Sequence, residues 1–223
     1  KGCWVRLINP KEKEIKKIVD EFKIPKNFII SSLDESEKPR IEREKDCIIR
    51  NLRFPYVIER KIKKRKDLRF GTLPLGIIIT KENLITISKI KNPILDEFSK
   101  GYIKEWFTTK RTRFLLQILF NMDKNYLSSL NEIEKDIEFL EDEIKETQKN
   151  KYVMKLLEMQ KSLVYFDTSI SGNGNILEKI LKGKIMKLYE EDIDLLEDII
   201  IENKQALEMT RVYRDIVNST TQA

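Results

Sequence analysis

Histidine is absent from the 223 residues, and cysteine occurs only twice, as Cys3 and Cys47. The first absence removes the commonest general base and a common metal ligand. Two cysteines give neither a metal-ligand spacing nor a disulfide framework, which indicates a reducing compartment. Any metal chemistry in these residues therefore relies on oxygen ligands, and hence on hard cations such as Mg²⁺.

Long apolar runs and glycine-rich motifs are also missing. No stretch of about eighteen apolar residues is present, so we expect no membrane span within these residues. Residues 1–10 lack the apolar segment of a signal peptide. There is no glycine-rich phosphate loop, and without histidine no serine or cysteine nucleophile has its usual base. We therefore predict that the chain is not an enzyme.

Charge is abundant but unevenly placed. Charged residues make up 36% of the chain, and the formal net charge is +6. Residues 1–100 carry 25 basic and 15 acidic side chains, whereas residues 101–223 carry 18 basic and 22 acidic ones. So high a charged fraction is typical of long, solvated helices.

The first hundred residues predict an α/β (α+β) domain with a mixed sheet flanked by helices. Apolar patterning predicts strands at 3–8, 47–49, 52–58, 75–80 and 84–88. Helical spacing predicts helices at 11–22, after Pro25 and after Pro93. The strands at 75–80 and 84–88 are apolar almost throughout, which is typical of strands covered on both faces.

From Tyr102 onward the apolar period is helical, which predicts long antiparallel helices. A stripe from Phe114 to Ile144 predicts the first, a polar break follows at 146–150, and residues 153–166 predict the second. Glycine and asparagine at 171–175 predict a loop before a short helix at 176–181. We divide the chain into an α/β domain (1–100), an acidic helical hairpin with a short helix (101–187) and a C-terminal stalk helix (188–223).

The stalk has the clearest helical pattern. Seven residues recur at alternating steps of three and four: Leu196, Ile199, Asn203, Ala206, Thr210, Tyr213 and Val217. This seam predicts close packing against a partner helix. Residues 219–223 carry no helix stop signal, so we expect the helix to continue beyond these residues.

A basic segment at residues 60–66, with the sequence RKIKKRK, places six positive charges in seven positions. Such a run suits contact with nucleic-acid phosphates or anionic lipid. A solvated hairpin tip explains it without a ligand, and we favour that interpretation because no aromatic residue interleaves the run.

An acidic segment at residues 190–202 holds seven acidic side chains and no basic one. Asp194, Glu197 and Asp198 lie three and four apart, on one helical face, where a divalent cation between subunits would relieve their repulsion. The alternative is an ordinary solvated face, whose first acids are stabilised by the helix dipole.

Several motifs occur in a recognisable order. Trp4 lies in a strand that ends at Asn9-Pro10, and the stretch LDESEKPRIE follows at 33–42. In the helical half stand DIEFLEDE at 136–143 and YRDIV at 213–217. Together they resemble, over nearly the whole chain, the cytoplasmic part of the CorA-type magnesium transporter family.

The resemblance implies a cation-sensing and gating domain on the cytoplasmic side of the cell inner membrane, in a homopentamer anchored by C-terminal membrane spans. Mg²⁺ held between neighbouring domains is implied to keep the pore shut. The transported ion it implies is Mg²⁺, with Co²⁺ or Ni²⁺ as further choices, and a zinc-moving relative stays open within the family. No nucleic-acid partner is implied.

The resemblance also implies site residues. Asp198 falls where the family has the metal carboxylate of its stalk, and Asp194 lies on the same face. The family's partnering acidic pair corresponds here to Ile30–Ser31, so Asp34 and Glu35, one turn later, are the expected substitutes.

Gln222 corresponds to a family position at the pore mouth that is often acidic, and a neutral amide there attracts cations less strongly. Outside the family two alternatives stay open. One is a basic nucleic-acid-binding protein that uses residues 60–66, and the other is a coiled-coil scaffold that docks a protein partner on its helical stripes.

Overall fold

The computed structural model describes residues 2–44, 47–62, 65–147, 150–183, 185–186 and 188–222. The strands are β1 Trp4–Ile8, β2 Arg40–Glu44, β3 Cys47–Ile62, β4 Arg65–Ile79 and β5 Leu84–Ser88. The helices are α1 Glu12–Phe22, α2 Lys26–Leu33, α3 Pro93–Ser99, α4 Arg111–Thr147, α5 Asn150–Leu181 and α6 Glu190–Gln222.

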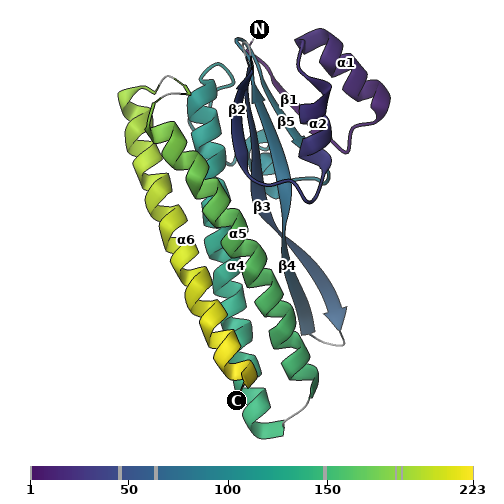
Figure 1. The fold of residues 1–223 in the computed structure, drawn as a ribbon, viewed down its shortest axis with the longest axis vertical. Helices are drawn as coiled ribbons and strands as arrows, with labels where there is room; N and C mark the ends of the chain where they lie inside the picture. Colours follow the sequence, from purple (N-terminus) through teal and green to yellow (C-terminus); the bar gives the residue numbers. More distant parts are fainter. Residues whose placement is uncertain are drawn as a thin grey trace.

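The described strands form one mixed, five-stranded sheet in the order β1-β5-β4-β3-β2. β1 runs parallel to β5, and the other neighbouring strands pair antiparallel. Every residue of β5 is buried, because α1 and α2 cover one face of the sheet and the long helices cover the other (Figure 1). The predicted α/β class with a mixed sheet and long C-terminal helices is therefore confirmed.

Helix α2 approaches the sheet closely at Gly76 of β4. A Cβ atom built on Gly76 would lie 2.0 Å from Ser32 Oγ of α2. That oxygen lies 2.8 Å from Asn51 Oδ1 of β3, and both residues are buried. Glycine at position 76 thus lets α2 rest on the backbone of the sheet.

The long helices α4, α5 and α6 pack side by side and share one apolar core with β3, β4 and β5. The predicted seam of α6 is confirmed, since all seven of its residues are buried. Its partners are α4 and α5 of the same chain. The seam is therefore occupied within the subunit, which removes the observation that favoured a scaffold for outside helices.

The prediction of a loop at residues 171–175 is wrong, because this stretch lies within the C-terminal half of α5. Its glycines provide close contact rather than a turn. A Cβ on Gly172 would lie 2.6 Å from Pro39 Cγ, and a Cβ on Gly174 would lie 2.6 Å from Asn203 Oδ1. Between them, the Asn173 side chain bonds the backbone N–H and carbonyl of Arg53 at 3.1 and 2.8 Å, which fixes α5 to β3.

The β3–β4 hairpin is longer than predicted, since β3 continues through residues 50 and 51 and β4 begins at Arg65 instead of residue 75. The two strands pair as far as Ile62 opposite Arg65. The basic segment 60–66 therefore lies at the closed end of the hairpin, and its Lys63 and Lys64 are outside the described residues. Arg69 of β4 forms a 2.8 Å ion pair with Glu158, which connects the hairpin to α5.

Candidate functional site

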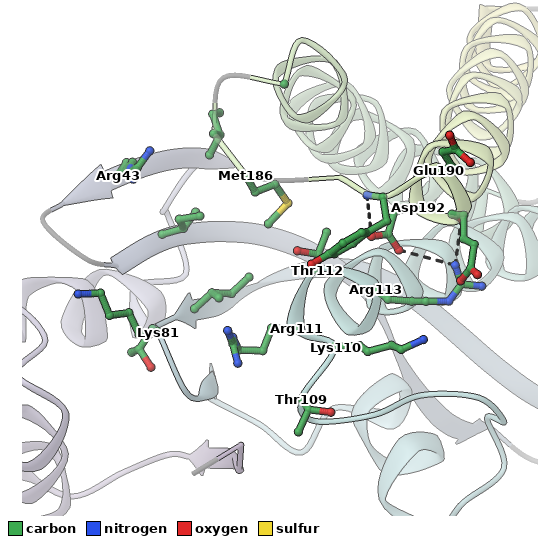
Figure 2. A pocket seen from close by; sticks show the side chains of 17 residues that line it. Arg43, Lys81, Thr109, Lys110, Arg111, Thr112, Arg113, Met186, Glu190 and Asp192 are labelled. Atoms are coloured by element: carbon green, nitrogen blue, oxygen red, sulfur yellow. Dashed lines mark hydrogen bonds and ion pairs between the residues drawn. The ribbon is translucent and has the colours of Figure 1, made fainter.

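The acidic first turn of α6 includes one carboxylate that serves the fold. Asp192 is buried, and its Oδ2 accepts a hydrogen bond from the backbone N–H of Tyr189 at 3.3 Å. Its Oδ1 lies 3.7 Å from Arg113 of α4 (Figure 2). This pattern of helix capping and ion pairing anchors the start of α6 on α4.

Asp194 and Asp198 lie on the outer face of α6, four residues apart and exposed. Among the described residues no basic side chain forms an ion pair with either of them. Carboxylates at this spacing repel each other and keep their acceptor oxygens available to a cation. The position of these two acids on one open face agrees with the helical spacing of the sequence.

Asp34 and Glu35 follow the end of α2, in the layer on the other side of the sheet. Asp34 Oδ1 accepts hydrogen bonds from the backbone N–H of Ser36 at 2.9 Å and from its hydroxyl at 2.8 Å. The backbone bond lowers the pKa of the Asp34 carboxyl most, followed by the hydroxyl bond. Glu35 forms an ion pair with Lys89 at 2.5 Å. Both side chains thus already have partners within the subunit.

The expected metal residues do not form a complete site in one subunit. Within the described parts of the chain, no group of three or more cysteine, aspartate or glutamate side chains is placed to hold a metal ion. Asp194 and Asp198 come together on α6, whereas Asp34 and Glu35 belong to another layer of the fold. Their assignment as ligands stays a prediction.

Gln222 is exposed and is the last residue of α6. The preceding turn is attached to the other two long helices. Thr220 donates a hydrogen bond to Glu141 of α4 at 2.6 Å, and Gln160 of α5 donates one to Asn218 at 2.6 Å. Gln222 and Asp194 lie at opposite ends of α6 (Figure 1).

The structure contains a buried polar contact in the middle of the helical bundle that the sequence analysis did not predict. Asp123 of α4 is 2% exposed, its Oδ1 accepts a hydrogen bond from Asn203 of α6 at 3.1 Å, and its Oδ2 has no described partner. Burial raises the pKa of Asp123 to about 8, so the neutral acid prevails at pH 7. Asn203 was the residue from which this contact could have been predicted. A buried asparagine in a helical seam needs a polar partner.

The comparisons with known proteins agree over the whole length. Residues 1–223 match the family described as "CorA-like Mg2+ transporter protein". The cobalt/magnesium transport protein CorA of Methanocaldococcus jannaschii is 27% identical over 226 residues, which cover 97% of this chain and 67% of that protein.

Solved structures repeat the fold. The soluble domain of CorA from Methanocaldococcus jannaschii has a TM-score of 0.85 at 26% identity, over 98% of this chain and 86% of that one. The complete CorA magnesium transporter of the same organism has a TM-score of 0.84 at 24% identity, over 98% and 68% of the two chains. The ZntB cytoplasmic domain from Vibrio parahaemolyticus has a TM-score of 0.73 at 13% identity, over 98% and 84%, which shows the fold alone.

None of the described helices combines the length and the apolar character needed to cross a membrane. The order of motifs, the mixed sheet with its long helices and the full-length match lead to one conclusion. The chain belongs to the CorA-like Mg²⁺ transporter family.

Proposed function

We propose that this chain senses Mg²⁺ on the cytoplasmic side of a membrane and gates the pore of a divalent-cation transporter. The observation that carries the proposal is the placement of Asp194 and Asp198 on the open face of α6 without a described basic partner. Carboxylates exposed at this spacing suit Mg²⁺, which keeps several of its waters and takes one or two carboxylates from a protein.

The site is completed by a second copy of the chain. Asp34 and Glu35 of one subunit lie opposite Asp194 and Asp198 of its neighbour in a homopentamer, and Mg²⁺ bridges the two surfaces. Glu35 exchanges Lys89 for the ion or for its bound water. Because the bridge exists only in the closed arrangement, bound Mg²⁺ shifts the population toward the shut pore.

The α6 helix transmits the signal along its length. Its 33 residues span about 50 Å at 1.5 Å per residue. The buried seam holds it against α4 and α5, so both ends move as parts of one packed element. Gln222 lies at the end that leads toward the membrane spans and the pore mouth. The transported ion is Mg²⁺, and Co²⁺ is a second cargo.

Millimolar Mg²⁺ is expected to raise the melting temperature of the chain, and the Asp194→Asn/Asp198→Asn double variant is expected to lose that rise. Ligand at about ten times its Kd stabilises the folded state by about 1.4 kcal/mol. For a chain of this size that is a shift of about 3–6 °C. The measurement is thermal unfolding across a Mg²⁺ titration, with sedimentation velocity on the same samples to record association.

The matched control is Glu208→Gln, which neutralises an exposed carboxylate elsewhere on α6. It is expected to keep the full Mg²⁺ response. An equal loss in the control and the double variant would indicate a general charge effect, and an unchanged response in the double variant would remove Asp194 and Asp198 from the site.

A further inference from the structure

A hollow of about 1140 Å³ lies between the start of α4, the start of α6 and the sheet (Figure 2). Basic side chains from three segments line it: Arg43 of β2, Lys81 of the β4–β5 turn, and Lys110, Arg111 and Arg113 at the start of α4. Arg111 points across the hollow toward that turn, with its Nη1 3.4 Å from the Glu82 carbonyl. The volume is slightly above the range of about 300–1,000 Å³ that is usual for small-molecule sites, so the hollow has room for such a ligand.

Acidic residues also reach the hollow, but they do not cancel its positive charge. Asp192 pairs with Arg113, whose Nη1 also donates to the Glu191 carbonyl at 2.9 Å. Glu190 and Glu191 are exposed, and Glu190 lies at the rim far from Arg43 and Lys81 (Figure 2). The basic side chains outnumber the acidic ones, and the positive side of the hollow is formed by β2, the β4–β5 turn and α4.

Arg50 supplies a second and independent observation. It is fully buried on β3, two residues beyond Ile48, which lines the hollow. Its Nη2 lies 3.3 Å from the sulfur of Met186, which forms part of the wall. No described residue accepts a hydrogen bond from its Nε or Nη1. Burial lowers the pKa of Arg50 to about 9, so the side chain is still a cation at pH 7.

An unpaired buried cation is unfavourable, and a thioether sulfur is a weak acceptor. An anion beside Arg50 would supply the acceptors that its Nε and Nη1 lack among the described residues. The start of α4 strengthens the same preference, because Arg111 begins a 37-residue helix whose N-terminus carries a partial positive charge. Arginine side chains together with a helix N-terminus form a setting suited to phosphate.

We propose that this hollow binds a small, soluble polyanion that carries phosphate groups. Arg111 and the first turn of α4 bind the outer phosphate, and Met186 turns aside so that a second anionic group meets Arg50. The hollow adjoins the start of α6 and lies far from Gln222, which favours a soluble ligand over a lipid headgroup. This inference does not depend on the Mg²⁺ site, because it uses none of the same residues.

The test is calorimetric titration of the 223-residue chain with sodium pyrophosphate in metal-free buffer. We expect saturable binding, weakened about tenfold or more by Arg111→Gln and by Arg50→Met, since a hydrogen bond to a charged group contributes about that factor. Arg211→Gln is the matched control, because Arg211 is an exposed arginine that pairs with Asp167 outside the hollow. It is expected to bind pyrophosphate as the parent chain does.

The Arg50→Met variant provides a second measurement, since it replaces a buried cation by an unbranched apolar side chain. Its melting temperature without pyrophosphate is expected to equal or exceed that of the parent, while its rise on adding pyrophosphate disappears. Absence of saturable binding up to about 5 mM, or equal affinity in all three variants, would overturn the proposal. Binding to phosphatidylglycerol vesicles without binding to pyrophosphate would also overturn it.

Discussion

Replacing Gly76 with alanine is expected to lower the free energy of unfolding by about 3 kcal/mol or more. The new Cβ would lie 2.5 Å from Ser32 Cβ as well as 2.0 Å from its Oγ. Rotation of the serine relieves only the second contact, because its Cβ is fixed by the backbone of α2. The helix must therefore move away from the sheet, and urea unfolding with the variant and the parent measures the loss.

A double-mutant cycle separates this clash from other effects of alanine. Glycine inside a strand is usually unfavourable, so without the clash Gly76→Ala would be neutral or stabilising. Ser32→Gly removes the opposing Cβ, and the Ser32→Gly/Gly76→Ala variant is expected to recover part of the stability that Gly76→Ala loses. A Gly76→Ala variant as stable as the parent, or additive effects in the cycle, would contradict the close approach of α2 to β4.

The sequence predicted those elements whose burial pattern follows from their own geometry. The seam of α6 was visible because each of its residues, from Leu196 to Val217, meets the same pair of helices. β5 was visible because both of its faces are covered, which favours a strand that is apolar almost throughout. The period of burial follows directly from the geometry of the element in both cases.

The errors arose where polar residues or glycines serve contacts between layers. Gly172 and Gly174 gave the appearance of a loop, but α5 needs them to pass close to Pro39 and Asn203. Arg50 and Asn51 interrupted an apolar run and split β3, although both are buried within it. These residues contact partners that are far away in the sequence. A local sequence pattern carries no information about such contacts.

The candidate site also has one part that the sequence predicted and one part that it did not. The spacing of Asp194 and Asp198 predicted one shared face, and a helix preserves that relation wherever it packs. Asp34 and Glu35 were placed by resemblance, and the bonds to Ser36 and Lys89 depend on the turn after α2 and on the β5 region. The geometry of an interface determines which ligands two subunits share. The spacing of residues within one chain does not predict that geometry.

Substituting asparagine for Asp123 is expected to increase stability at neutral and alkaline pH. The folded-state pKa is about 8, whereas the ordinary value that applies to the unfolded chain is 3.8. Between these values the folded state holds the proton and the unfolded state has lost it. The favourable contribution of the neutral acid is full below pH 3.8 and is lost as pH rises through about 8.

Asparagine has nearly the same shape, accepts the hydrogen bond from Asn203 and does not ionise, so it keeps the contact without this pH dependence. The stability difference between variant and parent is expected to grow by up to about 1.4 kcal/mol for each pH unit between about 5 and 8. Urea unfolding at several pH values measures it. Asp167→Asn, which breaks surface ion pairs with Arg211 and Arg214, is the control and should show no growing gain. A constant difference for Asp123→Asn across this range would mean that Asp123 does not hold its proton in the folded bundle.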